Sequence, residues 1–204
     1  MKTFAQALDQ QLIVGATQPG GPTSDYANFI QRGTGAKFHV VLGYSGTGAL
    51  YLAMQRGEIE SACGVDWDAL KAQQGEQLRD KEIGVLLQVD VKSDPELDAL
   101  GVPQPWPYMH DPLDRKAVAL MVDFQETFGK AYVAPPEVPT DRLAILRNGF
   151  AATLKDKDLL ANARKRHLEV DYISAADVTR TVTNLYAAPR AVIDRLKEMA
   201  GTHN

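Results

Sequence analysis

Three short loops, each rich in glycine and hydroxyl side chains, constrain the fold of this chain more than any other feature. Residues 15–24, 43–47 and 64–67 each follow an apolar run and precede a helical pattern. The first loop holds three Gly and two Pro within ten residues, a density that excludes regular helix or strand. Repetition of strand, polar loop and helix indicates an α/β protein with right-handed connections between parallel strands.

The apolar runs predict a buried parallel sheet. Strands are expected at residues 12–14, 38–42, 59–63 and 83–89. The last run is almost continuously apolar, as in strands that helices cover on both faces. Because parallel sheets bind ligands beyond the carboxyl ends of their strands, we expect the three loops to line one side of a small-molecule cleft. Thr23 or Ser24 is the expected cap of the first helix.

The second half of the chain has a different pattern. Residues 93–112 contain five Pro interleaved with Trp106 and Tyr108, which predicts a structured surface loop. The two aromatic side chains either flank a binding site or pin this loop. Further elements are expected in this order: a helix at 114–127, an extended strand at 128–136, helices at 140–154 (capped by Thr140) and 157–167, a strand at 168–173, and a helical region capped by Ser174 and broken at Pro189.

Composition excludes several classes of function. The net charge of −4 and the scattered Lys and Arg residues disfavour nucleic acid as a partner. One cysteine, Cys63, excludes an internal disulfide and a cysteine-built metal site. The four His show no ligand spacing, and neither the dinucleotide nor the Walker pattern is present, so no metal and no cofactor is indicated. The first ten residues lack the apolar core of a signal peptide.

Two side chains keep a hydrolytic α/β enzyme open as an alternative. Ser45 lies in a segment similar to the nucleophile elbow G-x-S-x-G, but Thr47 occupies the position of the second glycine. Cys63 is a candidate nucleophile or a small buried apolar residue at a strand end. Neither has a base at a recognisable spacing. Asp66 and Trp67 are likewise open between ligand binding and a structural role as helix cap and packing aromatic.

Two stretches carry a resemblance to a known family. They are residues 44–60, which include Gly57-Glu58-Ile59-Glu60, and residues 134–158, which open with Ala-Pro-Pro-Glu-Val-Pro. In these stretches, and in the order of its elements over nearly the whole length, the chain resembles the substrate-binding receptors of tripartite tricarboxylate transporters, the Bug family. The resemblance implies a periplasmic receptor without catalysis, with the membrane subunits of a transporter as partners.

The resemblance also implies a type II periplasmic-binding-protein-like fold. Residues 12–127 would form one near-complete βα lobe, the second of two, and residues 128–204 the C-terminal part of the first lobe. Segments near Leu12 and residues 128–134 would form the hinge between the lobes. The N-terminal strands of the first lobe have no counterpart in this sequence. We therefore expect a truncated form, a fragment or a protein that a partner completes, which binds small solutes weakly or not at all.

Ligand contacts are implied in all three loops, from backbone N–H groups and hydroxyls. The implied ligand is a small carboxylate. Asp25 stands where many members of the family have His, and with Asp66 nearby a neutral or amine-bearing ligand stays open as an alternative. An effector domain of a regulator shares this architecture but needs a DNA-binding segment that the sequence lacks. The implied ligand-binding residues are Thr17, Gly21, Thr23, Ser24, Tyr44, Ser45, Gly46, Thr47, Gly64, Asp66 and Trp67.

Overall fold

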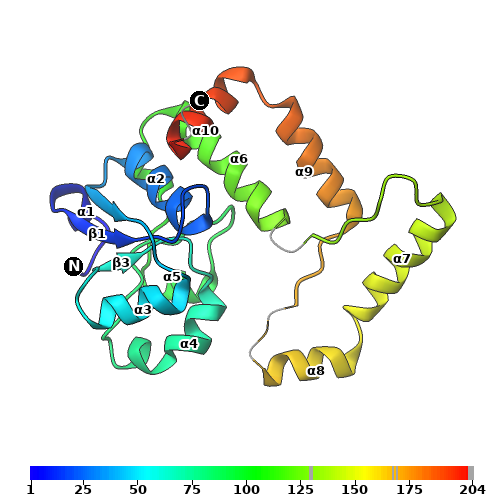
Figure 1. Ribbon diagram of the computed structural model, residues 1–204, viewed down its shortest axis with the longest axis horizontal. Helices are drawn as coiled ribbons and strands as arrows, with labels where there is room; N and C mark the ends of the chain where they lie inside the picture. The colour runs from blue at the N-terminus through cyan, green and yellow to red at the C-terminus, as the bar shows by residue number, and fades with distance from the viewer. Residues whose placement is uncertain (129–130, 167, 169, 202–204) are drawn as a thin grey trace.

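A three-stranded parallel sheet lies at the centre of the larger body of the molecule (Figure 1). The computed structural model describes residues 1–128, 131–166, 168 and 170–201. The strand order is β2-β1-β3, with β1 (Leu12–Gly15) between β2 (Phe38–Val41) and β3 (Ser61–Ala62). The helices are α1 (Gln6–Asp9), α2 (Pro22–Thr34), α3 (Thr47–Gln55), α4 (Trp67–Arg79), α5 (Pro95–Ala99), the 3-10 helix η1 (Trp106–Tyr108), α6 (Pro112–Phe128), α7 (Thr140–Thr153), α8 (Lys157–Lys165), α9 (Ala175–Ala187) and α10 (Arg190–Ala200).

Helices cover both faces of the sheet, as the apolar strands predict. Successive side chains of a strand point to opposite faces. In β1, Leu12 and Val14 join the larger core, which includes Phe29 of α2. Ile13 packs into a smaller cluster on the other face, built around Leu50 of α3. The predicted layering of helix, sheet and helix is therefore confirmed.

Helix α2, which follows the first loop, begins and ends with the residues that helix termini favour. Pro22 is at its first position, and Gly35 ends it in the left-handed conformation at φ 78°. The predicted cap is wrong. Gly21 is the N-cap and no side chain caps the helix. Thr23 and Ser24 lie inside the first turn instead, where their hydroxyls bind the preceding loop.

Two C-terminal helices return to the body and pack on α6 and α2. Ala117, Val118 and Val122 of α6 and Met199 of α10 are buried in the larger core. The predicted cap of α9 is confirmed, because the Ser174 hydroxyl accepts a hydrogen bond from the Asp177 N–H at 3.1 Å. The predicted break at Pro189 is also confirmed, since α9 ends before it and α10 starts after it.

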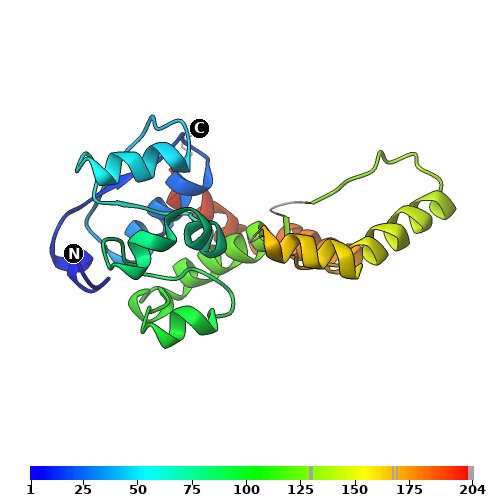
Figure 2. The same cartoon turned by 90° about the horizontal axis from the view of Figure 1, so that it is seen from below.

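The described residues between 131 and 173, here called the arm, extend away from the body. Figures 1 and 2 both show α7 and α8 well separated from the sheet. Helix α7 has no buried residue. Inside the arm, the rings of Tyr132 and Phe150 lie 5.0 Å apart, and those of Phe150 and Tyr172 lie 6.5 Å apart. Large apolar side chains of the arm are exposed to solvent: Tyr132, Val133, Ile145, Leu146, Phe150, Leu168 and Ile173.

Among the described residues, three predicted strands do not form, and a fourth is shorter than expected. Residues 83–89 form no ladder; the Ile83 N–H donates to the Gln77 carbonyl and the Gln88 N–H to the Pro103 carbonyl. The described residues of 128–136 and of 168–173 also lack strand structure, while residues 129, 130 and 169 lie outside the described part. The strand predicted at 59–63 is present only as the two residues of β3. Apolar character buries a segment, but a strand exists only where a neighbour pairs with it.

Smaller predictions meet mixed outcomes. Thr140 is not a cap, because Pro139 is the N-cap of α7. The Tyr108 ring packs edge-on against Phe4 at 4.9 Å, so this residue pins the Pro-rich loop. That loop also contains α5 and η1, which the sequence pattern did not predict. The division into lobes at residues 12–127 and 128–204 stays a prediction.

Candidate functional site

The three loops meet at the carboxyl end of the parallel sheet. The Gly43 N–H donates to the Thr17 carbonyl at 2.9 Å, and the Tyr44 N–H donates to the Ala16 carbonyl at 3.3 Å. The third loop lies against the start of α2, because a Cβ on Gly64 would be 2.5 Å from the Pro22 carbonyl oxygen. The structure therefore brings together the predicted residues of all three loops.

The hydroxyls of the first loop bind one another and the local backbone. Thr23 Oγ1 accepts from the Thr17 N–H and lies 2.9 Å from Thr17 Oγ1. Ser24 Oγ lies 2.7 Å from the Gln18 carbonyl and 2.9 Å from the Gly21 carbonyl. These hydrogen bonds fix the shape of the loop above α2. Thr23 and Ser24 are both buried, so their contribution is to hold the loop.

The second loop presents free backbone donors at the start of α3. Within the described residues, the N–H groups of Ser45, Gly46, Thr47 and Gly48 form no hydrogen bond to another backbone or side-chain group. No side chain caps α3. Free N–H groups at a helix N-terminus, with the positive end of the helix dipole, attract negatively charged or polar oxygen atoms. The exposed side chain of Ser45 adds a hydroxyl to this end.

The third loop uses both of its polar predicted side chains for structure. Asp66 is the N-cap of α4, and its carboxylate accepts from the Ala69 N–H at 2.8 Å. The indole N–H of Trp67 donates to Glu96 at 2.9 Å, and Lys71 donates to the same carboxylate oxygen at 2.6 Å. These hydrogen bonds lower the pKa of Glu96. Of the two roles left open for Asp66, the structure shows the helix cap.

A buried carboxyl group, Asp25, lies in the first turn of α2. Its side chain is 7% exposed. Burial raises the pKa of Asp25, against the opposing effects of hydrogen bonds from Ser24 and the Gly20 N–H. The carboxyl group therefore holds its proton more tightly than a solvated aspartate. Because Asp25 lies under the first loop, its protonation state affects which ligand charge the site favours.

The two candidate nucleophiles lack activation. Burial raises the pKa of the Cys63 thiol to about 12, so the thiol is protonated at neutral pH. Ser45 is exposed, and no described side chain forms a hydrogen bond to its hydroxyl. Nucleophilic catalysis needs a thiolate or an adjacent base. Among the described residues, no group of three His, Cys, Asp or Glu side chains is arranged to hold a metal ion.

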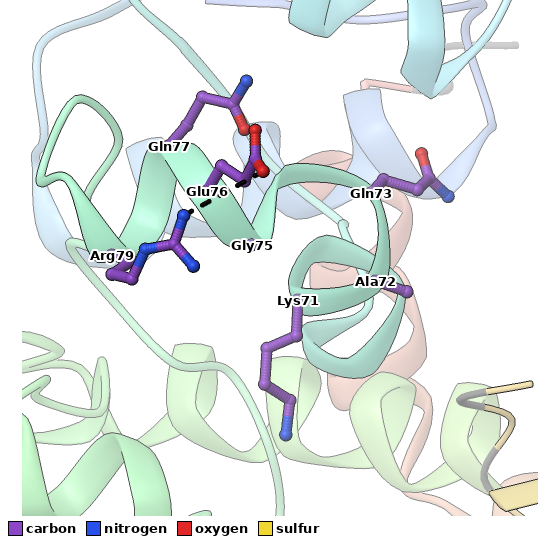
Figure 3. A pocket seen from close by; sticks show the side chains of 7 residues that line it. All are labelled: Lys71, Ala72, Gln73, Gly75, Glu76, Gln77 and Arg79. Carbon is purple, nitrogen blue, oxygen red and sulfur yellow. Dashed lines mark ion pairs between the residues drawn. The ribbon is translucent and has the colours of Figure 1, made fainter. Parts of the chain in front are cut away.

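A separate hollow lies at a kink in α4. Gln74 has non-helical backbone angles, and its neighbours Gln73 and Gly75 both line the hollow (Figure 3). Its lining comes from α4 alone and includes no residue of the three loops. The side chains drawn in Figure 3 are polar or short, and Glu76 and Arg79 pair across the helix surface at 4.0 Å. This hollow therefore lies apart from the three loops.

Sequence reasoning missed one polar group near the loops. The Tyr51 hydroxyl on α3 is buried and, within the described part of the chain, has no hydrogen-bond partner. The side chain as a whole is 5% exposed. Burial raises the pKa of Tyr51, and the negative charge of Asp66 adds to the effect. A tyrosine within a helical apolar pattern gives no sequence signal that distinguishes it from an ordinary core residue.

Comparison with solved structures gives the fold. A TctC solute-binding protein from Polaromonas, solved without ligand, superposes with a TM-score of 0.57 at 15% identity, over 95% of this chain and 60% of that one. A protein of R. palustris, solved with adipate, gives a TM-score of 0.58 at 19% identity, over 97% of this chain and 59% of that one. The chain has the type II periplasmic-binding-protein-like fold. The fold that the sequence resemblance implied is therefore confirmed.

This periplasmic-binding-protein-like chain spans about 60% of the length of the solved structures that it matches. No family model and no curated protein matches its sequence. In the part of the chain that the structure describes, no helix combines the length and apolar character that crossing a bilayer requires. The shared fold places its three loops at the edge of the sheet where parallel α/β proteins take up ligands.

Proposed function

We propose that this chain is an extracytoplasmic solute-binding receptor for a small carboxylate or a related metabolite, and that it acts with the membrane subunits of a tripartite tricarboxylate-type transporter. The solved neighbours support this proposal, because one is a TctC solute-binding protein and the other was solved with adipate. A periplasmic location follows from the same likeness. No catalysis is proposed, since Ser45 and Cys63 both lack activation.

The observation that carries the proposal is the set of free N–H groups from Ser45 to Gly48. They lie at the carboxyl end of the sheet, next to the first loop. A carboxylate oxygen is a natural acceptor for such donors. In this proposal residues 43–47 bind the ligand directly, and the bonded hydroxyls of Thr17, Thr23 and Ser24 hold the neighbouring loop in place.

The charge of the ligand depends on two carboxyl groups of the site. Asp66 is exposed beside the third loop, and Asp25 is buried under the first. An anionic ligand is repelled by Asp66, whereas an amino group is attracted by it. Because burial favours the neutral form of Asp25, that residue opposes an anion less than an ionised aspartate would. A carboxylate is the leading ligand, and a neutral or amine-bearing solute is the second candidate.

Two further parts of the proposal concern the lobes. Residues 12–127 form the second ligand-binding lobe and residues 128–204 the C-terminal part of the first, with a hinge near Leu12 and residues 128–134. The exposed apolar side chains of the arm support this division, since a packed lobe would cover them. Because the apolar side chains of the arm are exposed and not packed against a lobe, we expect the 204-residue chain to bind its solute weakly.

The test is a titration of the isotope-labelled 204-residue chain with adipate, followed by amide NMR. We expect shifts confined to residues 15–24, 43–48 and 64–67, with a dissociation constant in the millimolar range. Succinate and putrescine, titrated in parallel, separate a carboxylate site from an amine site. Shifts spread over α7 and α8, or no shift with any of the three compounds, would contradict the proposal. Micromolar affinity by calorimetry would contradict the expected weak binding.

A further inference from the structure

The Tyr51 hydroxyl is an unexplained polar group in the body of the molecule. Its oxygen is buried and has no hydrogen-bond partner among the described residues, and the side chain is 5% exposed. Buried hydroxyls are almost always bonded, because an unpaired one costs about 1–3 kcal/mol of desolvation. A hydroxyl in this state therefore points to a partner that arrives from outside the chain.

The helix geometry directs this hydroxyl towards the free end of α3. Tyr51 lies four residues after Thr47, so the two side chains share one face of the helix. Helical side chains lean towards the helix N-terminus, and that of Tyr51 therefore covers the preceding turn. The N-terminus of α3 is where the N–H groups of residues 45–48 are free.

The third loop supplies a negative charge, that of Asp66, within electrostatic reach of this hydroxyl. The negative charge of Asp66 contributes to the raised pKa of Tyr51, which places the phenol within electrostatic reach of that loop. Asp66 does not accept from the phenol, and its carboxylate bonds the Ala69 N–H instead. The hydroxyl is thus a buried donor without an acceptor among the described residues, on the helix whose N-terminus the second loop forms and within reach of the charge of the third loop.

We propose that Tyr51 is a ligand-binding residue of this site and that its hydroxyl donates a hydrogen bond to an oxygen atom of the bound solute. The inference rests on the proposed function and adds a side-chain donor to the backbone donors of the second loop. A phenol donor paired with free N–H groups selects solutes that present at least two acceptor oxygens, as a carboxylate does.

The experiment compares Tyr51→Phe with the wild-type chain, and Tyr186→Phe, whose side chain is 87% exposed, is the matched control. Denaturation without ligand is measured first. Because the lost hydroxyl has no partner in the free chain, the midpoint for Tyr51→Phe is expected to equal or exceed that of the wild type. Adipate titration follows, and its dissociation constant is expected to rise about tenfold in Tyr51→Phe and to stay unchanged in Tyr186→Phe.

Each outcome decides between the two proposals. A lower midpoint for Tyr51→Phe would overturn the inference, because the hydroxyl would then have a structural partner such as a buried water. An unchanged midpoint with unchanged adipate binding would also overturn it, while leaving the proposed function intact. Absence of adipate shifts in the wild-type chain would contradict the proposed function, and the role of Tyr51 would fall with it.

Discussion

Arg195 on α10 holds the buried carboxylate of Asp114 on α6 with two hydrogen bonds. The Nε–Oδ1 distance is 2.5 Å and the second bond measures 3.2 Å. The Asp114 side chain is 6% exposed and that of Arg195 25%. The fork geometry of the guanidinium suits a carboxylate, and this pair ties the last helix to the body across 81 positions of sequence.

Removing one member of this pair should destabilise the chain strongly. Asp114→Ala leaves the guanidinium partly buried without its main acceptor, and we expect a loss of about 3 kcal/mol in the free energy of unfolding. Chemical denaturation measures this loss. The control is Arg190→Ala, at a side chain that is 94% exposed and 3.5 Å from Asp194, with an expected change below about 0.5 kcal/mol. Equal losses of unfolding free energy in the two variants would show that the buried pair stabilises the chain no more than an exposed ion pair does.

Gly64→Ala should cost about 3 kcal/mol of stability, because the new Cβ meets backbone atoms that cannot move cheaply. The residue has φ +64°, and the Cβ would lie 2.5 Å from the Pro22 carbonyl oxygen. Gly48→Ala is the matched control, since a Cβ on this helical residue has nothing within 4 Å. It should leave stability unchanged or raise it by up to about 1 kcal/mol. Thermal unfolding of both variants checks the contrast.

The pair of Glu126 and Asp90 should make stability fall as pH rises. Burial, followed by the hydrogen bond to Asp90, raises the pKa of Glu126 from 4.5 to about 7. The folded chain thus holds this proton more tightly than the unfolded chain, and the stabilisation is full below pH 4.5 and lost as pH rises through 7. Solvent screening limits the effect to about 1 kcal/mol. Glu126→Gln should flatten the profile of unfolding free energy against pH, whereas Glu137→Gln should not.

The arm should tolerate loss of its apolar side chains in the isolated chain. Leu146 on α7 is 59% exposed, and Leu50 on α3 is fully buried. We expect Leu146→Ala to change stability by less than about 0.5 kcal/mol and Leu50→Ala to cost about 3 kcal/mol. Urea denaturation compares the two. A cost for Leu146→Ala close to that of Leu50→Ala would mean that the arm is covered in solution.

Cys63 should be unreactive in the folded chain. With a pKa of about 12, its thiolate fraction at neutral pH is negligible. Ellman's reagent is expected to label the chain only after denaturation, with a single thiol released per chain. Rapid labelling of the native chain at neutral pH would contradict the raised pKa of this thiol and would reopen the hydrolytic alternative.

Several helix ends and the central strands could be predicted from the sequence, because they depend on residues that are adjacent in the chain. The start of α9 was predictable because Ser174 satisfies a free N–H three residues ahead. The end of α2 at Gly35 and the break at Pro189 follow from backbone preferences alone. The central strands were predictable because an apolar run of 12–14 or 38–41 between glycine-rich turns has few other uses.

Strand pairing and the hydrogen-bond partners of side chains could not be predicted from neighbouring residues. Residues 83–89 have the composition of a strand, but no described segment completes a ladder with them. The hydroxyls of Thr17 and Thr23 are predicted ligand contacts, and in the folded chain they lie 2.9 Å from each other, a pairing that the sequence pattern does not indicate. In the sequence Tyr51 cannot be distinguished from an ordinary core residue, and in the folded chain its hydroxyl has no partner among the described residues. Sequence by itself determined the α/β class, the three loops and several helix ends, because glycine, proline and hydroxyl side chains act on the backbone next to them. Only the tertiary structure decided which donors stay free for a ligand, because a donor's partner can lie far away in sequence and comes close to it only when the chain folds.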